Sequence, residues 1–289
     1  MQQLIRQCKE TLRSLGFDLF VPFSVQHYNS LVQKRFQVSD YGRENTLAIL
    51  IGNTRNLWTP FIKHLCEIDY QCDQDPNPLD SYTKSCVTSS FQIFPVEQDI
   101  HYTWEMTRGR ILPFQRISEI SGLCENSKLS HLTYHPKYSS WIGLRAVAIL
   151  NADFEDAKEF ALPPIQPCIC QECDEKAKVV LDELMRTTDY MELHRNDEVW
   201  RRWLSLRTIC EKQPYVYSWP QAAYHYSKNQ KYLVGEKERM QKGTFELDYD
   251  WVADFNKDIL GYKREIFFCV CSIIPHKIRR KKREFVTNI

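Results

Sequence analysis

One arginine in the sequence stands where a charge is costly. Arg145 lies between Leu144 and Ala146 in an apolar run, residues 141–150, that has the pattern of a buried strand. An unpaired buried charge costs on the order of several kcal/mol. Two interpretations remain open. Arg145 either forms a structural ion pair or faces water on an edge strand, or it is a fixed guanidinium that binds a carboxylate or phosphate at the mouth of a pocket.

A cysteine cluster is the second candidate for chemistry. Cys168-x-Cys170-x-x-Cys173 has the spacing of half a zinc site or of a redox dithiol. A structural zinc needs a second pair, and Cys269 and Cys271 are far away with one residue between them. The spacing therefore favours loop thiols without a structural metal. Eleven cysteines with no secretory signal indicate reduced and mostly buried thiols.

The histidines form no recognisable motif. His101, His131 and His135 lack the H-E-x-x-H spacing of metalloproteases, and no Ser/His/Asp grouping can be assembled from the sequence. With 9 glycines, the chain contains neither a P-loop nor a G-x-G-x-x-G fingerprint. We therefore predict no metal site, and we interpret these histidines as hydrogen-bonded structural groups.

Charge and hydropathy exclude two classes of partner. Lys and Arg number 38 and Asp and Glu 37, so a net charge of +1 argues against nucleic-acid binding. The basic run at residues 279–283 is interpreted as a solvated end. Residues 1–12 are polar and helical, unlike a signal peptide, and no apolar run reaches the ~18 residues that span a bilayer. A soluble, cytoplasmic protein is expected.

The first part of the chain predicts alternating helices and strands. Apolar residues recur at helical spacing over residues 4–15. Residues 17–20 predict a short strand that Pro22 ends. The continuous apolar run at residues 46–52 is typical of a central strand covered on both faces.

Further elements decide the fold class. Residues 90–96 are predicted as another strand, and the Ser218-x-x-Gln221 capping box predicts a helix over residues 218–232. Several strands are too close in sequence for helical crossovers. The order favours an α+β sheet with packed helices over a doubly wound fold.

Segments in a shared order resemble the CblC family of cobalamin-processing proteins (methylmalonic aciduria and homocystinuria type C). The most specific segment is residues 135–145, His-Pro-Lys-Tyr-Ser-Ser-Trp-Ile-Gly-Leu-Arg. Trp200-Arg201-x-Trp203 and the segment from Tyr217 to Tyr224 are also similar to the family. The resemblance covers about residues 4–235. It implies a flavin-nitroreductase-like mixed sheet with packed helices in a domain at 1–235, followed by a tail at 236–289.

The resemblance also implies an activity. Family members bind cobalamin with its benzimidazole base off the cobalt, transfer alkyl groups to the thiolate of glutathione, and remove cyanide by reduction with a reduced flavin, FMN or FAD. No side chain then serves as nucleophile, because glutathione supplies the thiolate. A corrin is a wide, mostly apolar disc, which suits a broad site with few polar anchors.

Family site residues carry over by position. The corrin contacts are Ile111, Leu112, Gln115, Thr133 and Leu144. Arg145 matches a glutathione-binding arginine, which favours the second interpretation of its charge. A second family arginine falls at Leu206 in strict register, with Arg207 one place later, and a third falls close to Lys231.

Partners and alternatives follow from the same resemblance. It implies a CblD-type adaptor protein and delivery to methionine synthase and methylmalonyl-CoA mutase. The alternatives are a cobalamin-trafficking chaperone without chemistry and a flavin-dependent nitroreductase. A carrier has no need of a carboxylate site at Arg145.

One segment departs from the family. The tyrosine-rich cover of the corrin is shortened here to residues 122–127, which contain no tyrosine. We expect a more open site in which oxygen reaches reduced cobalt. Oxygen-dependent oxidation of glutathione is then a predicted side activity.

Overall fold

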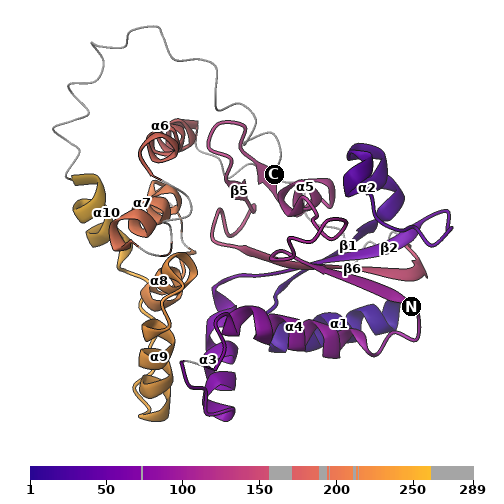
Figure 1. Ribbon diagram of the computed structural model, residues 1–289, viewed down its shortest axis with the longest axis horizontal. Helices are drawn as coiled ribbons and strands as arrows, with labels where there is room; N and C mark the ends of the chain where they lie inside the picture. The colour runs from indigo at the N-terminus through magenta and orange to yellow at the C-terminus, as the bar shows by residue number, and fades with distance from the viewer. Residues whose placement is uncertain are drawn as a thin grey trace, which may run out of the picture.

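A four-stranded sheet forms the centre of the protein. The computed structural model describes residues 1–72, 74–155, 171–188, 194, 196–210, 213 and 215–261. The strand order is β1-β2-β6-β3, and all three pairings are antiparallel (Figure 1). The α+β class is as predicted, but the described sheet is antiparallel where a mixed sheet was expected. The bounds are β1 Leu19–Ser24, β2 Thr46–Asn53, β3 Gln98–Tyr102 and β6 Gly143–Asp153.

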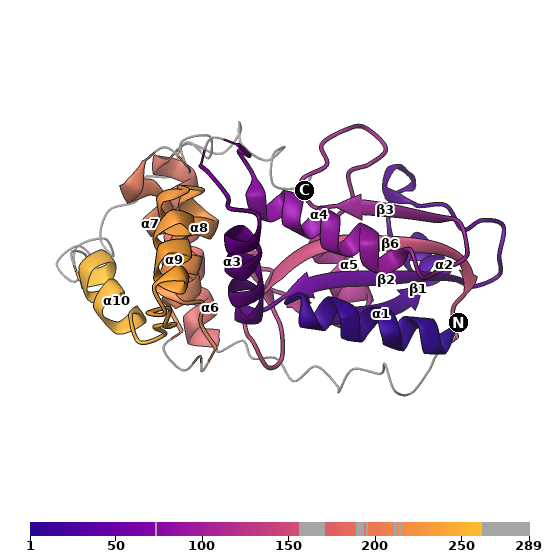
Figure 2. The ribbon, with the colours of Figure 1, turned by 90° about the horizontal axis from the view of Figure 1, so that it is seen from below.

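Helices cover both faces of this sheet. Figures 1 and 2 show α1, α3 and α4 against one face and α2 and α5 against the other. Strand β2 explains why both faces need cover, since Leu47, Ile49 and Ile51 enter one core and Ala48 and Leu50 the other. The prediction of a central strand at residues 46–52 is confirmed. The bounds are α1 Gln2–Ser14, α2 Val25–Leu31, α3 Trp58–Glu67, α4 Pro78–Phe91 and α5 Phe114–Ile120.

A second group of helices lies beyond one end of the sheet. Its own core is aromatic and includes Trp141, Trp200, Tyr217 and Trp251. Helix α9 packs on α3 and so joins this helical part to the sheet (Figure 2). The bounds are α6 Gln171–Thr187, α7 Asp197–Thr208, α8 Trp219–Ser227, α9 Lys231–Gln241 and α10 Val252–Gly261. The short elements are η1 Lys34–Phe36, η2 Arg55–Leu57, β4 Glu125–Asn126 and β5 Thr133–Tyr134.

Three local predictions were wrong, each for a physical reason. Residues 90–96 are not a strand, because α4 runs to Phe91 and buries Tyr82, Cys86 and Val87 on one helical face. Pro22 does not end the first strand. It lies within β1, which is paired only with β2 among the described strands, and an edge strand tolerates a missing N–H.

The helix predicted over residues 218–232 is divided in two. Lys228 adopts a left-handed conformation with φ 54° and ends α8, and α9 begins at Lys231. The expected capping box does not form, because the Ser218 hydroxyl makes no capping hydrogen bond. The break turns the chain and changes where the side chain of Lys228 lies.

The structure describes part of the region on which the remaining predictions fall, namely the domain boundary, the tail and the cysteine cluster. The boundary expected after Gly235 lies inside α9, and Trp251 and Phe255 of the predicted tail pack in the aromatic core. Cys168 and Cys170 lie outside the described residues, whereas Cys173 is partly buried on α6. Across the described residues, no helix is long and apolar enough to cross a bilayer, and no three His, Cys, Asp or Glu side chains are grouped as metal ligands.

Candidate functional site

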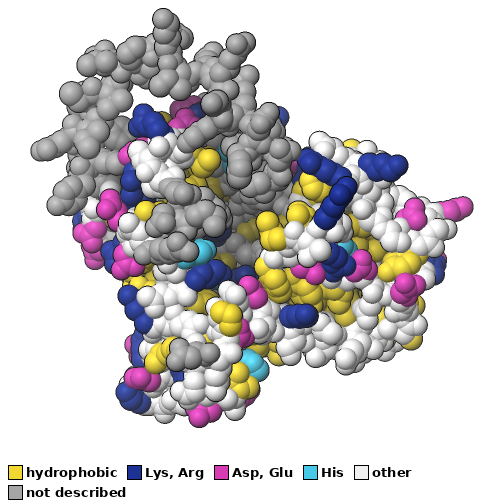
Figure 3. Space-filling view, viewed as in Figure 1, with side chains coloured by type: hydrophobic (Ala, Val, Ile, Leu, Met, Phe, Trp, Pro, Cys, Tyr) yellow, Lys and Arg dark blue, Asp and Glu magenta, His cyan; other side chains and the backbone are white. Residues whose placement is uncertain are grey.

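A cavity of about 600 Å³ lies where the end of the sheet meets the helical part. Figure 3 shows basic side chains beside a histidine at this junction. We name its walls by what they contain. The sheet wall is Gly143, Leu144 and Arg145; the helical wall is Arg207, Tyr217, His225, Tyr226 and Lys228; the neutral wall is Phe114, Gln115, His131, Leu132 and Thr133. Thr103, Ser140, Ile142 and His194 complete the lining.

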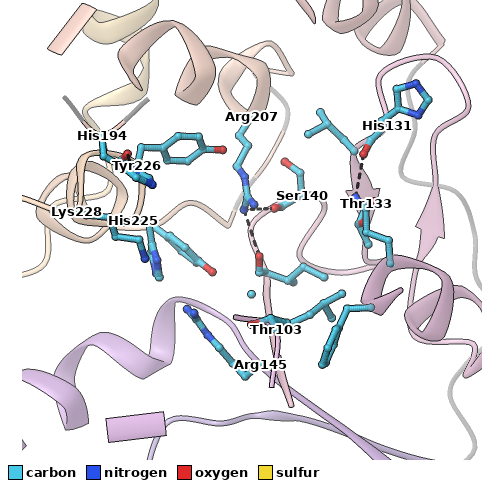
Figure 4. A pocket seen from close by; sticks show the side chains of 17 residues that line it. Thr103, His131, Thr133, Ser140, Arg145, His194, Arg207, His225, Tyr226 and Lys228 are labelled. Carbon is cyan, nitrogen blue, oxygen red and sulfur yellow. Dashed lines mark hydrogen bonds between the residues drawn. The ribbon is translucent and has the colours of Figure 1, made fainter. Parts of the chain in front are cut away.

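Arg145 is the buried cation of the sheet wall. Its strand β6 pairs with β2 on one side and β3 on the other, and Arg145 is 8% exposed. Its Nε donates a hydrogen bond to Asn53 Oδ1 at 2.6 Å, and no carboxylate in the described residues lies within ion-pair distance of it. Both structural interpretations of this charge are therefore wrong for the described part of the chain. The guanidinium is instead part of the cavity lining (Figure 4).

Two glycines make room for this arginine. A Cβ atom on Gly143 would lie 2.8 Å from Asn53 Oδ1 and 3.1 Å from Arg145 Nη2. A Cβ on Gly52, opposite, would lie 2.7 Å from the carbonyl oxygen of Gly143. The strand pairing shifts register between Ile51 and Gly52, so this end of the sheet is irregular. The absence of side chains here lets the guanidinium fold back over the strand.

Arg207 is the cation that α7 contributes. Its Nη1 donates to the carbonyl oxygens of Ser140 at 2.5 Å and Ile142 at 3.2 Å. Its neighbour Leu206, the strict-register position, is buried and lies outside the lining. Of the two candidates from the sequence, the structure brings Arg207 to the cavity.

Lys228 is the third cation. The left-handed residue at the end of α8 directs its side chain to the cavity, on the same side as His225 (Figure 4). Burial lowers the pKa of Lys228, and Asp80 opposes this shift. Lys231, the position expected from the sequence, is exposed, lies over the Tyr232 ring and does not line the cavity.

The cavity lining therefore carries positive charge that no acidic side chain of the lining balances. Arg145, Arg207 and Lys228 line the cavity, and none of its described lining residues is Asp or Glu. Asp80 on α4 is a carboxylate that interacts with two of these cations. Burial raises the pKa of Asp80, and Lys228 and Arg145 act to lower it. Burial also lowers the pKa of Arg145, and Arg207 adds to the effect. Such a site favours a ligand that carries two or more negative charges.

The neutral wall faces these cations. Gln115, Thr133 and Leu144, all predicted corrin contacts, line the cavity. Gln115 Nε2 donates to the His131 carbonyl at 3.0 Å, and Thr133 Oγ1 to Asn126 Oδ1 at 2.7 Å. The other two predicted contacts are outside the lining: Ile111 is 40% exposed and Leu112 is buried in the core beneath.

A carboxylate from the helical part holds the neutral wall in place. Asp174 on α6 is 6% exposed and accepts hydrogen bonds from Ser127 Oγ at 2.6 Å and Ser130 Oγ at 2.5 Å. The shortened segment at residues 122–127 ends at this contact, and its strand β4 pairs with β5. Helix α6 thus fixes the loop that leads into Thr133.

Several lining residues had no usable signal in the sequence. Tyr217 belongs to a segment noted only for its resemblance, and Lys228 sat inside a predicted helix. His225 is surrounded by three cations and buried, which holds its pKa well below the usual value. Only the packing of α8 on α7, and of its Tyr224 on α3, brings these side chains together, and no spacing in the sequence predicts this packing.

The sheet, its two helical layers and the helical part that closes a cationic cavity define an α+β fold of the nitroreductase-like CblC type. The crystal structure of a B12-trafficking protein CblC from C. elegans, described as a homologue of human MMACHC, matches over 80% of this chain and 94% of that chain. The TM-score is 0.60 at 17% sequence identity. The predicted fold class is thus confirmed. No family model and no curated protein sequence matches the chain.

Proposed function

We propose that this protein binds cobalamin and removes its upper axial ligand. The fold is similar to that of a protein described as a B12-trafficking protein. Residues 135–145 resemble the CblC family in sequence and form the approach to the sheet wall. The cavity adds a neutral wall beside a cationic one, which is the division that a corrin and an anionic co-substrate require.

The observation that carries the proposal is the set of three cations without a carboxylate. Glutathione has two carboxylates, and Arg145, Arg207 and Lys228 are arranged to bind them. Arg145 is buried and has no carboxylate within ion-pair distance among the described residues, so a bound carboxylate would offset its desolvation. In this proposal Lys228 takes the part that the sequence resemblance suggested for Lys231.

The chemistry follows from this arrangement. The thiolate of glutathione attacks the alkyl carbon on the cobalt of base-off cobalamin, a thioether forms, and the electron pair of the broken bond stays on the cobalt. A free thiol has a pKa of about 8.5, and nearby cations favour its thiolate. The protein supplies position and charge, and the corrin supplies the reactive metal as substrate.

Two further activities belong to the same proposal. Cyanide leaves cobalamin after reduction by a reduced flavin, FMN or FAD, acting as donor. The shortened segment at residues 122–127 lacks the family's tyrosine-rich cover, so we expect oxygen to reoxidise the cobalt and consume glutathione. Anaerobic and aerobic rates of glutathione oxidation then differ sharply, and equal rates contradict this activity.

A trafficking role without chemistry is the second candidate. The name of the C. elegans protein favours it, since that name describes trafficking. Either function fits a cytoplasmic protein that binds a CblD-type adaptor and delivers cobalamin to methionine synthase and methylmalonyl-CoA mutase. The cationic wall argues for chemistry, because a carrier needs no site for the carboxylates of glutathione. A flavin nitroreductase, the third alternative, would retain a coloured flavin on purification.

One titration separates these functions. Methylcobalamin is added to the protein while the absorbance spectrum is recorded, and glutathione follows without oxygen. A base-off spectrum followed by conversion to reduced cobalamin is the expected result. A base-off spectrum without conversion favours the carrier, and no spectral change contradicts cobalamin binding.

A further inference from the structure

His225 has a buried ring nitrogen that the protein itself does not use. The residue is on α8 and lines the cavity, and its Nε2 atom is buried with no hydrogen-bond partner in the described residues. Its ring lies against Tyr217, at 5.2 Å between centroids and 36° between planes, and near Tyr224 at 6.3 Å. Buried polar atoms are normally paired, so this nitrogen is available to a ligand.

The groups that face His225 keep it uncharged. Three cations act on it electrostatically, namely Arg145 on β6, Arg207 on α7 and Lys228 at the end of its own helix. Burial and these three cations hold the pKa of His225 well below its usual value. Burial raises the pKa of both Tyr217 and Tyr224, so neither phenol supplies a negative charge at neutral pH. The imidazole of His225 is therefore neutral before a ligand binds.

Other lining groups are less suited to take a proton. Nδ1 of His194 donates to the Tyr226 carbonyl at 2.8 Å, and His131 is exposed on the opposite, neutral wall. The Tyr217 hydroxyl is buried and stays protonated. Within the described lining, His225 is the neutral base that adjoins all three cations.

We propose that His225 accepts the proton of the glutathione thiol in the reaction proposed above, on which this inference rests. Carboxylates bound at Arg145, Arg207 and Lys228 neutralise the charges that suppress its basicity. The S–H bond then breaks, the proton passes to Nε2 and the thiolate remains. The sulfur forms its bond to the alkyl carbon while the carbon–cobalt pair stays on the metal. The imidazolium returns its proton to solvent when the thioether leaves.

The order of events explains the three cations. A protonated histidine would also attract the anionic ligand, but it could not accept a proton from the thiol. Burial is the larger cause of the low pKa of His225, and the three cations add to it, so carboxylates bound at those cations raise the basicity of the imidazole when glutathione is present. The carboxylates of glutathione thus raise the basicity of His225, and His225 in turn removes the proton from the glutathione thiol.

The test uses His225→Gln, which keeps hydrogen bonding but removes the base. Anaerobic dealkylation of methylcobalamin is measured against pH, with exposed His27→Gln as the matched control. At pH 7 we expect the variant to be slower by about 100-fold, the lower end for general base catalysis. The deficit shrinks above about pH 8.5, where solution supplies the thiolate. A deficit that is equal at every pH would mean that His225 is only structural and would overturn the inference.

A second measurement needs no cobalamin. The ultraviolet absorbance of the thiolate is followed as glutathione binds to wild type and to His225→Gln across the same pH range. We expect thiolate at neutral pH in the wild type and only at higher pH in the variant. His225→Phe, which preserves the ring contact with Tyr217, replaces the glutamine variant if that one does not fold.

The two proposals fail differently. If wild type dealkylates methylcobalamin and both variants retain its pH profile, His225 is not the proton acceptor and the proposed function stands. If wild type binds neither cobalamin nor glutathione, the proposed function fails and the inference fails with it.

Discussion

The sheet wall and the helical wall of the cavity differ in how fully their polar atoms are paired. On β2 and β6, no described buried side-chain nitrogen or oxygen lacks a hydrogen bond. Beside the helical wall, buried atoms without partners gather, among them Arg207 Nε, Tyr217 Oη, Gln221 Oε1 and Nε2, and His225 Nε2. The unpaired buried atoms therefore lie on the helical side, whereas the sheet side has paired polar atoms and one buried cation that no carboxylate contacts among the described residues.

This difference follows from how each wall is built. Arg145 projects from an interior strand whose backbone is paired on both sides. The helical wall is held by an aromatic core in which Trp141 contacts Tyr217 and Trp251 edge to face, and these contacts use ring edges and faces rather than hydrogen-bonding groups. A ligand should therefore order the helical wall more than the sheet wall. Hydrogen exchange with and without glutathione measures this directly.

Removing the cation of the sheet wall should have the largest effect on binding. Arg145→Gln deletes a charge-assisted contact worth about 2 to 3 kcal/mol, so glutathione should bind about 30- to 150-fold more weakly while cobalamin affinity changes little. Calorimetric titration with each ligand measures the two affinities. Arg43→Gln, which removes a cation paired with Asp153 outside the cavity, is the control. Equal loss of both ligands would make Arg145 a structural residue.

The carboxylate that joins the helical part to the neutral wall should come next. Asp174→Ala leaves the buried hydroxyls of Ser127 and Ser130 without their acceptor, at a cost of about 2 kcal/mol of unfolding free energy. Denaturant unfolding measures it, and Asp182→Ala on the exposed side of the same helix is the control. Cobalamin binding should weaken more than glutathione binding, because the neutral wall moves. The reverse order would contradict the division of the cavity into walls.

Lys228 and Lys231 offer a matched pair three residues apart. Lys228→Gln should weaken glutathione about fivefold, on the scale of about 1 kcal/mol, and Lys231→Gln should have no effect. The effect is smaller than at Arg145, because an ammonium lacks the two parallel donors by which a guanidinium binds a carboxylate. A loss at Lys231 alone would restore the role first expected from the sequence.

The last prediction concerns stability against pH rather than ligand affinity. Burial, with Lys137 nearby, lowers the pKa of His135 to about 4, and its Nδ1 accepts the backbone N–H of Lys137 at 3.0 Å. The unfolded chain takes up this proton near pH 6.5 and the folded one does not. This stabilisation is present above pH 6.5 and is lost as pH falls toward 4. His135→Gln should flatten thermal unfolding midpoints over that range, whereas exposed His27→Gln should not.

The sequence predicted the structure best where the composition of a single strand indicates how that strand is buried. The apolar run at residues 46–52 requires cover on both faces, and Arg145 within a second such run requires a partner, so both features were readable before the fold was known. The strand predicted at residues 90–96 was wrong, because Ser90 and Phe91 form the buried end of α4 and residues 92–96 connect that helix to β3. Local preference alone does not separate a strand from a helix there.

The helical wall was not predictable in the same way. Arg207 and Leu206 are equivalent in pattern, and only the packed face of α7 selects Arg207. Lys228 depends on a left-handed turn at a lysine, which no spacing signals. His225 owes its low pKa to burial first and then to cations on β6, on α7 and at the end of α8. Such sites arise from tertiary contacts between distant segments.

The two walls are also separated along the chain. Every strand of the sheet lies before residue 154, and α6 to α9 follow residue 170. On a ribosome, the sheet and Arg145 can therefore complete their pairing before the residues that finish the cavity have emerged. A nascent chain at that stage already contains the buried cation but lacks Arg207, His225 and Lys228. Under the proposed function, we expect glutathione to bind only after synthesis has passed the end of α8, because two of the three cations come from α7 and from the end of α8.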